Sequence, residues 1–176
     1  MSKRSRSDVS NTAVRIFLQE IGESYDRARG FERFSPTKKQ KEALLNHFAF
    51  QCCYCGLEIS IKSFSQDHLV AHNKTSLGLN SWGNVVPCCS GCNSEKGSSP
   101  WIEFIAGKCN SKSILDKRTR KINDFVKLKK YDPDLGLLKE YADNLYTDVG
   151  AVAMTLIQLR IKQAEAEIGK LHKIGE

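Results

Sequence analysis

The chain has 176 residues, a mass of 19.8 kDa and a net charge of +7, from 27 Lys and Arg against 20 Asp and Glu. This length favours one compact module with helical additions and excludes a large multidomain protein. An apolar fraction of 40% is enough to form a core, which excludes wholesale disorder. We expect no membrane partner and a cytoplasmic location, because there is neither a run of about 20 apolar residues nor a signal-peptide pattern.

The two flanks of the chain hold most of the excess positive charge. Residues 52–110 contain four basic and four acidic side chains, whereas both flanks contain more basic than acidic ones. The densest stretch is 108–130, with nine basic and two acidic side chains. On a helix, this density suggests a polyanionic partner, although a solvated helix face would have the same composition.

The first 50 residues predict an arm and two helices. Residues 1–8 are polar, basic and rich in serine, and we expect a mobile arm there. A helical stripe of apolar residues over 9–21 predicts a helix that Gly22 ends. Ser35 and Pro36 supply an N-cap and a first-turn proline for a second helix, which continues to about Phe48.

The middle of the chain predicts two short strands followed by helices. Alternating apolar residues that begin at Leu57 predict a strand within 57–70, and Val85 and Val86 predict a second one. The stretch between them, 71–83, is rich in Asn, Gly and Ser and predicts a loop. After the second strand we expect a helix at 93–97 and another from Ser99 and Pro100 to Gly107.

The last third of the chain predicts helices only. One covers 112–130, a second runs from Asp132 to about 146, and Thr147 caps a long third helix to about 172. The broad apolar face of the third helix is either core or a dimer seam. The fold class is thus α+β, with three regions: a basic arm and N-terminal helices (1–50), a central core (51–107) and a C-terminal helical region (108–176).

Six of the seven cysteines cluster in a way that predicts a metal site. Two Cys-x2-Cys pairs, Cys52 with Cys55 and Cys89 with Cys92, offer the four thiolates of a structural Zn²⁺ site. Gly56 and Gly91 fit the tight turns of such pairs. Cys53 and Cys88 are adjacent spares that we treat as non-ligands, and no role is assigned to Cys109.

The central sequence resembles the HNH endonuclease family. Besides the cysteine pairs, the resemblance rests on four elements in the same order: Asp67-His68, Asn84, Asn93 directly after the last cysteine, and Lys96-Gly97. It covers about residues 51–97 and implies a ββα-metal nuclease motif. It further implies that the Asn84 amide bridges the loop between the strands and so orients the histidine.

Phosphodiester hydrolysis requires a base and a hard cation. The imidazole of His68 suits the deprotonation of water near neutral pH. The oxygens of Asp67 and Asn93 suit a catalytic Mg²⁺ or Mn²⁺, and adjacent strand residues point to opposite sides, so His68 faces away from Asp67. His72 is either a loop residue or a group that contacts phosphate or supports the site.

These features predict a metal-dependent HNH endonuclease that cleaves double-stranded DNA, with a type II restriction enzyme as the first choice. A homing, phage or toxin-type nuclease and a non-catalytic zinc module that binds nucleic acid are the alternatives. Lys96 either touches a DNA phosphate or caps a helix. On the 112–130 helix, we expect Lys117, Arg120 and Lys121 to grip the DNA backbone. Cleavage of both strands would suit a homodimer.

Overall fold

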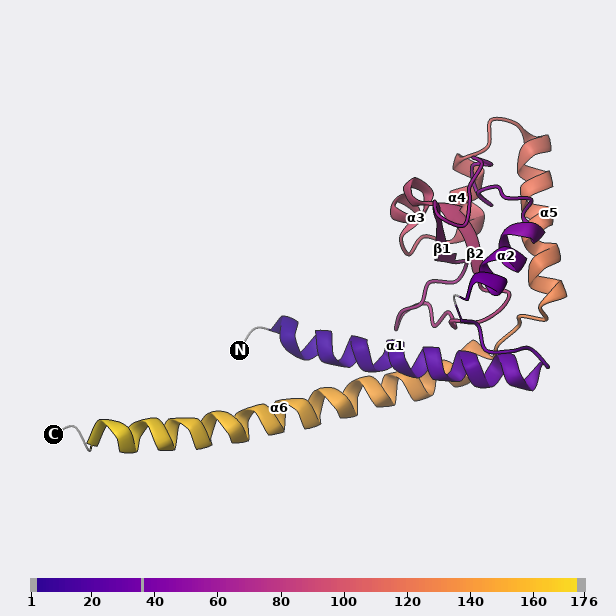
Figure 1. The fold of residues 1–176 in the computed structure, drawn as a ribbon. Coiled ribbons are helices and arrows are strands. Elements are labelled where there is room, and N and C mark those ends of the chain that lie inside the picture. The colour runs from indigo at the N-terminus through magenta and orange to yellow at the C-terminus, as the bar shows by residue number, and fades with distance from the viewer. Residues whose placement is uncertain (1–2, 36, 174–176) are drawn as a thin grey trace.

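The computed structural model describes the backbone of residues 3–35 and 37–173 and the side chains of residues 7–35 and 37–165. The fold is α+β, with a two-stranded sheet in the middle of the chain and helices at both ends (Figure 1). The elements in chain order are α1 Lys3–Ala28, α2 Lys38–His47, β1 Phe64–His68, β2 Val85–Cys89, α3 Ser90–Lys96, α4 Trp101–Gly107, α5 Lys112–Leu128 and α6 Leu135–Lys173.

The centre of the molecule is a β-hairpin followed directly by a short helix. Strands β1 and β2 are antiparallel, with Asp67 opposite Val86 and His68 opposite Val85. Helix α3 begins at the residue after β2 and packs against both strands. This is the ββα arrangement that the HNH resemblance implied, and the long 69–84 connection joins its two strands.

One hydrophobic core joins the hairpin to the helices on one side of it. Side chains from α2, β2, α4 and α5 contribute to this core, including Leu45, Val86, Ile105 and Phe125, each of which is at most 1% exposed. Helix α5 is amphipathic, because Ile122 and Phe125 face this core while its charged residues face outward. The core therefore fixes α5 against the cysteine-bearing segment.

A second, smaller core joins α1 and α6 to the loop between the strands. Helices α1 and α6 lie side by side in opposite directions (Figure 1). The buried residues of this core are Val14 and Leu18 of α1, Leu77 and Leu79 of the loop, and Leu138 and Ala142 of α6. Beyond this contact α6 projects away from the rest of the molecule (Figure 1), and Val152, Leu156, Leu159 and Ile161 are exposed on it.

The N-terminal expectations need correction. Helix α1 begins at Lys3, so residues 3–8 are helical rather than a mobile arm, and residues 1–2 lie outside the described part. Gly22 does not end the helix. Its lack of a side chain instead allows the Asn80 backbone to lie close to α1, since a Cβ at Gly22 would lie 2.7 Å from the Asn80 carbonyl oxygen. The N-cap of α2 is Thr37, whose hydroxyl accepts from Gln40, while Pro36 lies outside the described residues.

Two further boundaries differ from expectation. The alternation at Leu57 does not form a strand: Leu57 is 59% exposed, and β1 begins only at Phe64, after a turn. The two predicted C-terminal helices are one continuous helix, α6. Thr147 does not cap a helix, because its hydroxyl donates to the Asp143 carbonyl one turn earlier. The strand at 85–86, the 71–83 loop and α5 are confirmed.

No helix in the described part of the chain is both long enough and apolar enough to cross a membrane.

Candidate functional site

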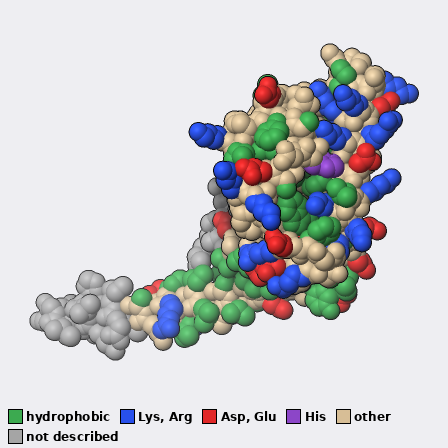
Figure 2. Space-filling view, turned by 45° about the vertical axis from the view of Figure 1, so that its right-hand side comes forward, with side chains coloured by type: hydrophobic (Ala, Val, Ile, Leu, Met, Phe, Trp, Pro, Cys, Tyr) green, Lys and Arg blue, Asp and Glu red, His purple; other side chains and the backbone are tan. Residues whose placement is uncertain are grey.

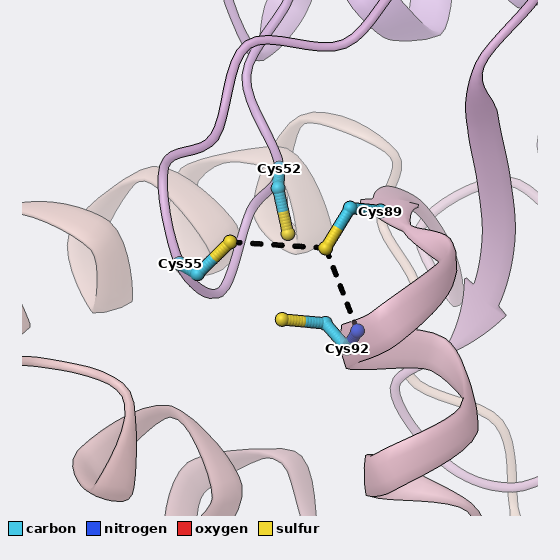
Figure 3. A group of neighbouring side chains, drawn as sticks. All are labelled: Cys52, Cys55, Cys89 and Cys92. Atoms are coloured by element: carbon cyan, nitrogen blue, oxygen red, sulfur yellow. Dashed lines mark hydrogen bonds between the residues drawn. The ribbon is translucent and has the colours of Figure 1, made fainter.

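Four cysteine side chains converge beside the hairpin. The Sγ atoms of Cys52, Cys55, Cys89 and Cys92 all lie within 4.8 Å of one another, and they point toward a common centre (Figure 3). The Sγ atoms of Cys55 and Cys89 are 3.8 Å apart. A tetrahedral Zn²⁺ with sulfur at about 2.3 Å holds its ligands about 3.8 Å apart, so the cluster fits a structural zinc ion.

Local structure sets up each half of this cluster. Cys89 ends β2 and accepts a hydrogen bond from the backbone of Cys92, which lies one turn into α3. On the other half, the backbone of Gly56 donates to Cys52, and Gly56 adopts φ +77°, a conformation that favours glycine. Gly91 needs no such freedom, because it lies within α3 and a Cβ there would meet nothing within 4 Å.

Arg118 of α5 clamps the first cysteine turn. Its guanidinium donates to the backbone carbonyls of Tyr54 (2.9 Å) and Cys55 (2.7 Å). The basic helix is therefore tied directly to the cysteine cluster.

The spare cysteines lie outside the cluster. Cys53 and Cys88 are buried in the core, and the Cys88 thiol donates to the backbone carbonyl of Ser65. Burial raises the pKa of both thiols, which favours their neutral form. Cys109 is half-buried near the Arg118 side chain.

His68 ends β1, and its ring is held by the loop between the strands. Its Nε2 lies 3.2 Å from the Oδ1 of Asn80. An amide oxygen only accepts, so Nε2 donates the proton and Nδ1 carries the free lone pair. Burial, followed by the neighbouring His72 ring, lowers the pKa of His68 to about 4. The imidazole is therefore neutral at cellular pH and can act as a base.

His72 stacks on His68. The two rings are nearly parallel, at 15°, with centroids 5.0 Å apart. The Nδ1 of His72 lies 2.8 Å from the Gly78 carbonyl oxygen and donates to it. His72 supports the His68 ring by stacking, and the same loop holds both rings.

Asn84 bridges that loop. It is fully buried directly before β2, where its Oδ1 accepts from the Val70 backbone (2.8 Å) and its Nδ2 donates to the carbonyls of Val70 (3.0 Å) and Leu79 (2.9 Å). Leu79 precedes Asn80, the partner of His68. Asn84 is thus placed to position the histidine through the loop rather than to touch a substrate.

Asp67 lies in a buried network on the opposite side of β1 from His68. Its Oδ2 accepts a 2.5 Å hydrogen bond from the Tyr54 hydroxyl and lies 3.1 Å from Nζ of Lys96. The same ammonium group donates to the His68 carbonyl at 2.8 Å. Lys96 is 1% exposed, so the expectation that it contacts a DNA phosphate is corrected: its charge is directed inward.

Asp67 and Asn93 carry the oxygen donors that we expect to bind a hard divalent cation. Both contacts of Asp67 fall on Oδ2, which leaves Oδ1 for a cation. Asn93 is half-buried in α3, three residues before Lys96 and therefore on the same helix face. Because Lys96 reaches Asp67, that face is directed toward β1. One carboxylate and one amide oxygen suit Mg²⁺ or Mn²⁺ better than a softer ion.

Comparison with known proteins agrees with this geometry. Residues 52–99 match the family described as HNH endonuclease. The central segment is an HNH domain. The match begins at Cys52 and ends just after α3, so it contains the cysteine cluster, the hairpin, His68 and Asn93. HNH domains are generally nucleases that act on DNA with divalent metals, which supports an endonuclease. No significant match was found among curated proteins.

The basic residues expected on α5 lie along one open face. Lys117 and Arg120 are exposed and Lys121 is half-buried, and together with Asp116 and Asp124 they line a shallow hollow. We call Lys117, Arg120 and Lys121 the α5 basic face. Figure 2 shows Lys and Arg side chains over the side of the molecule that α5 occupies.

Three site residues escaped the sequence analysis: Asn80, Tyr54 and Arg118. Asn80 was visible only as one of several polar loop residues, and nothing local marks it as the partner of His68. Tyr54 lies between Cys52 and Cys55, where the sequence alone indicates only a core aromatic residue. Arg118 lies among many basic residues, and only the fold reveals that it turns toward the cysteine turn.

Proposed function

We propose that the protein is a metal-dependent HNH endonuclease that hydrolyses phosphodiester bonds of double-stranded DNA. The observation that carries this proposal is the state of His68: its Nε2 is engaged by an amide oxygen, its Nδ1 is unprotonated, and it ends the first strand of an HNH domain. A non-catalytic zinc module would have no need for a histidine held in this way.

In this proposal each group has a distinct role. His68 takes the proton from the attacking water through Nδ1. Asp67 and Asn93 would hold Mg²⁺ or Mn²⁺, which supplies positive charge for the phosphate and the leaving oxygen. Asn84 and Asn80 are positioning residues for the His68 ring. Zn²⁺ bound by the cysteine cluster would be structural and would fix the turn at residues 52–55 to the end of β2 and the start of α3.

The flanking helices provide the surfaces for substrate and assembly. We propose that the α5 basic face grips the DNA backbone and adds affinity without reading sequence. An HNH domain flanked by helices in this way suits a type II restriction enzyme in the cytoplasm. One catalytic centre per chain calls for two copies to cut both strands, and the exposed apolar residues of α6, along the projecting part of the molecule in Figure 2, offer a pairing face.

The test is digestion of plasmid DNA by the wild-type protein with and without Mg²⁺ or Mn²⁺, beside His68→Ala. Gln66→Ala is the matched control, since Gln66 lies two residues earlier on the same strand. Loss of a general base lowers the rate about 10²- to 10⁴-fold. Metal-dependent cleavage that His68→Ala loses and Gln66→Ala retains supports the proposal, whereas DNA binding without cleavage favours the zinc module.

Substrate class is resolved by the same assay. Parallel digestion of unmodified plasmid, modified phage DNA and RNA, followed by sequencing of the ends, distinguishes the candidate nucleases. Double-strand ends at one short sequence support a restriction enzyme. Nicks or a single long site favour a homing or phage nuclease, and cutting without sequence preference favours a toxin.

A further inference from the structure

Helix α1, which lies outside the segment that matches the HNH family, packs directly on the loop that holds His68. Val14 and Leu18 are fully buried against Leu77 and Leu79 of this loop. Gly22 approaches the Asn80 backbone so closely that a Cβ would lie 2.7 Å from its carbonyl oxygen. The side chain of Asn80 in turn holds the His68 ring. One face of α1 is therefore part of the wall around the candidate catalytic centre.

Arg15 lies on this same face of α1. It precedes Gly22 by seven residues, which is two helical turns and about 10 Å along the axis, so the two residues share a helix face. His72, which stacks on His68, interacts with the backbone of Arg15. The charge of Arg15 also acts on both rings, since it contributes to the lowered pKa of His68 and of His72.

Among the described side chains, the guanidinium of Arg15 has no partner that would neutralise it. Its side chain is exposed, and none of the hydrogen bonds or ion pairs found among the described side chains uses it. By contrast, Arg27 on the same helix pairs with Glu23, and Arg29 pairs with the buried Asp26. An unpaired guanidinium whose charge acts on the His68 and His72 rings fits an anion, and the planar guanidinium matches phosphate oxygens.

We propose that Arg15 contacts a phosphate of the DNA strand presented to His68, so that the N-terminal helix completes the active site of the HNH domain. This inference rests on the proposed function, because it assigns a substrate contact to that same site. It makes α1 part of the catalytic unit: the HNH segment supplies the base and the metal ligands, and α1 supplies a fixed cation for the phosphate.

The test compares Arg15→Ala, Arg15→Lys and the control Arg27→Ala. Arg27 is a suitable control because it lies on the same helix with an exposed side chain. A charged hydrogen bond to phosphate is worth about 10- to 150-fold, so kcat/KM of Arg15→Ala falls by that factor. Arg15→Lys keeps the positive charge but lacks the planar guanidinium, so its kcat/KM lies between those of Arg15→Ala and the wild type. Arg27→Ala cuts like the wild type.

Binding is measured separately, so that the two proposals fail in different ways. In a His68→Ala background with Ca²⁺, the affinity for a labelled duplex is followed across a salt series. Loss of Arg15 lowers the affinity and reduces the slope of log K against log salt by about 0.9, as expected for one phosphate contact. Zinc content and thermal midpoint equal to those of the background protein show that the fold is retained.

An Arg15→Ala protein that binds and cuts like the wild type overturns the proposal, as does an equal loss in Arg27→Ala. If the wild type fails to cut DNA at all, the proposed function fails, while the binding series still decides the role of Arg15.

Discussion

The buried pair of Lys96 and Asp67 gives a sharp test of the structure around the hairpin. In Lys96→Met the chain of similar length still fills the space, but the Asp67 carboxylate keeps only the Tyr54 hydroxyl as a partner. The side chains of Lys96 and Asp67 are 0% and 7% exposed, so water cannot replace the lost ammonium group. A buried charge without its partner is strongly unfavourable.

The expected size of the effect follows from this burial. Removal of one partner of a buried ion pair costs about 3–5 kcal/mol, which lowers the thermal midpoint of a chain of this size by about 6–20 °C. Lys62→Met is the matched control, because Lys62 is exposed just before β1 and its loss changes stability by at most about 0.5 kcal/mol. Melting is measured with zinc present and Mg²⁺ absent.

A double-mutant cycle separates pairing from the loss of either side chain. Asp67→Asn alone leaves the ammonium of Lys96 buried with only the His68 carbonyl, whereas Asp67→Asn with Lys96→Met removes both charges. The double variant is therefore destabilised by less than the sum of the two single variants. A Lys96→Met protein that melts with the wild type but binds DNA more weakly would refute this reasoning and return Lys96 to the DNA surface.

Three other predictions follow from the remaining parts of the site. Cys89→Ser loses zinc and unfolds the central domain because the metal contributes folding free energy, whereas Cys88→Ser retains zinc; metal analysis giving the reverse would change the ligand assignment. Replacing all three residues of the α5 basic face with Ala flattens the salt slope of DNA binding by about three units and leaves the cleavage position unchanged, and an unchanged slope would show that this face only meets solvent. Because the pKa of His68 is lowered to about 4, its imidazole stays neutral near pH 6.5. We therefore expect kcat/KM to remain constant near pH 6.5 and to decrease only as the pH approaches 4. Because the pKa is lower in the folded state, the associated contribution to stability is complete above pH 6.5 and disappears as the pH falls toward 4. An acid limb of kcat/KM centred at pH 6.5 would contradict the lowered pKa.

The local parts of the centre could be predicted from the sequence. The Cys-x2-Cys spacing predicts two tight turns. Because Asp67 and His68 are adjacent at a strand end, their side chains are predicted to point to opposite sides of the strand. These features depend on neighbours in the chain, and the structure brings the four cysteines together and sends Asp67 and His68 to opposite sides of β1. The second strand, the intervening loop and α5 followed from composition and periodicity for the same reason.

What could not be predicted depends on contacts between distant segments. The side chain of Lys96 points inward because it pairs with Asp67, 29 positions earlier. The orientation of His68 depends on Asn80, whose position is set by the packing of the loop. The N-terminal helix continues through Gly22 because it docks on the same loop. Likewise, α6 remains a single helix past Thr147, although Thr is a common N-cap residue. The three proposed domain boundaries remain predictions.

The proposed function depends above all on His68 as the base of a metal-dependent DNA endonuclease. The most direct test is the single-turnover rate of plasmid cleavage in Mg²⁺ for the wild type, His68→Ala and Gln66→Ala, each with its zinc content and melting midpoint verified. We predict cleavage by the wild type and by Gln66→Ala, and a rate about 10²- to 10⁴-fold lower for His68→Ala despite intact zinc and folding. A His68→Ala protein that cuts as fast as the wild type would contradict it.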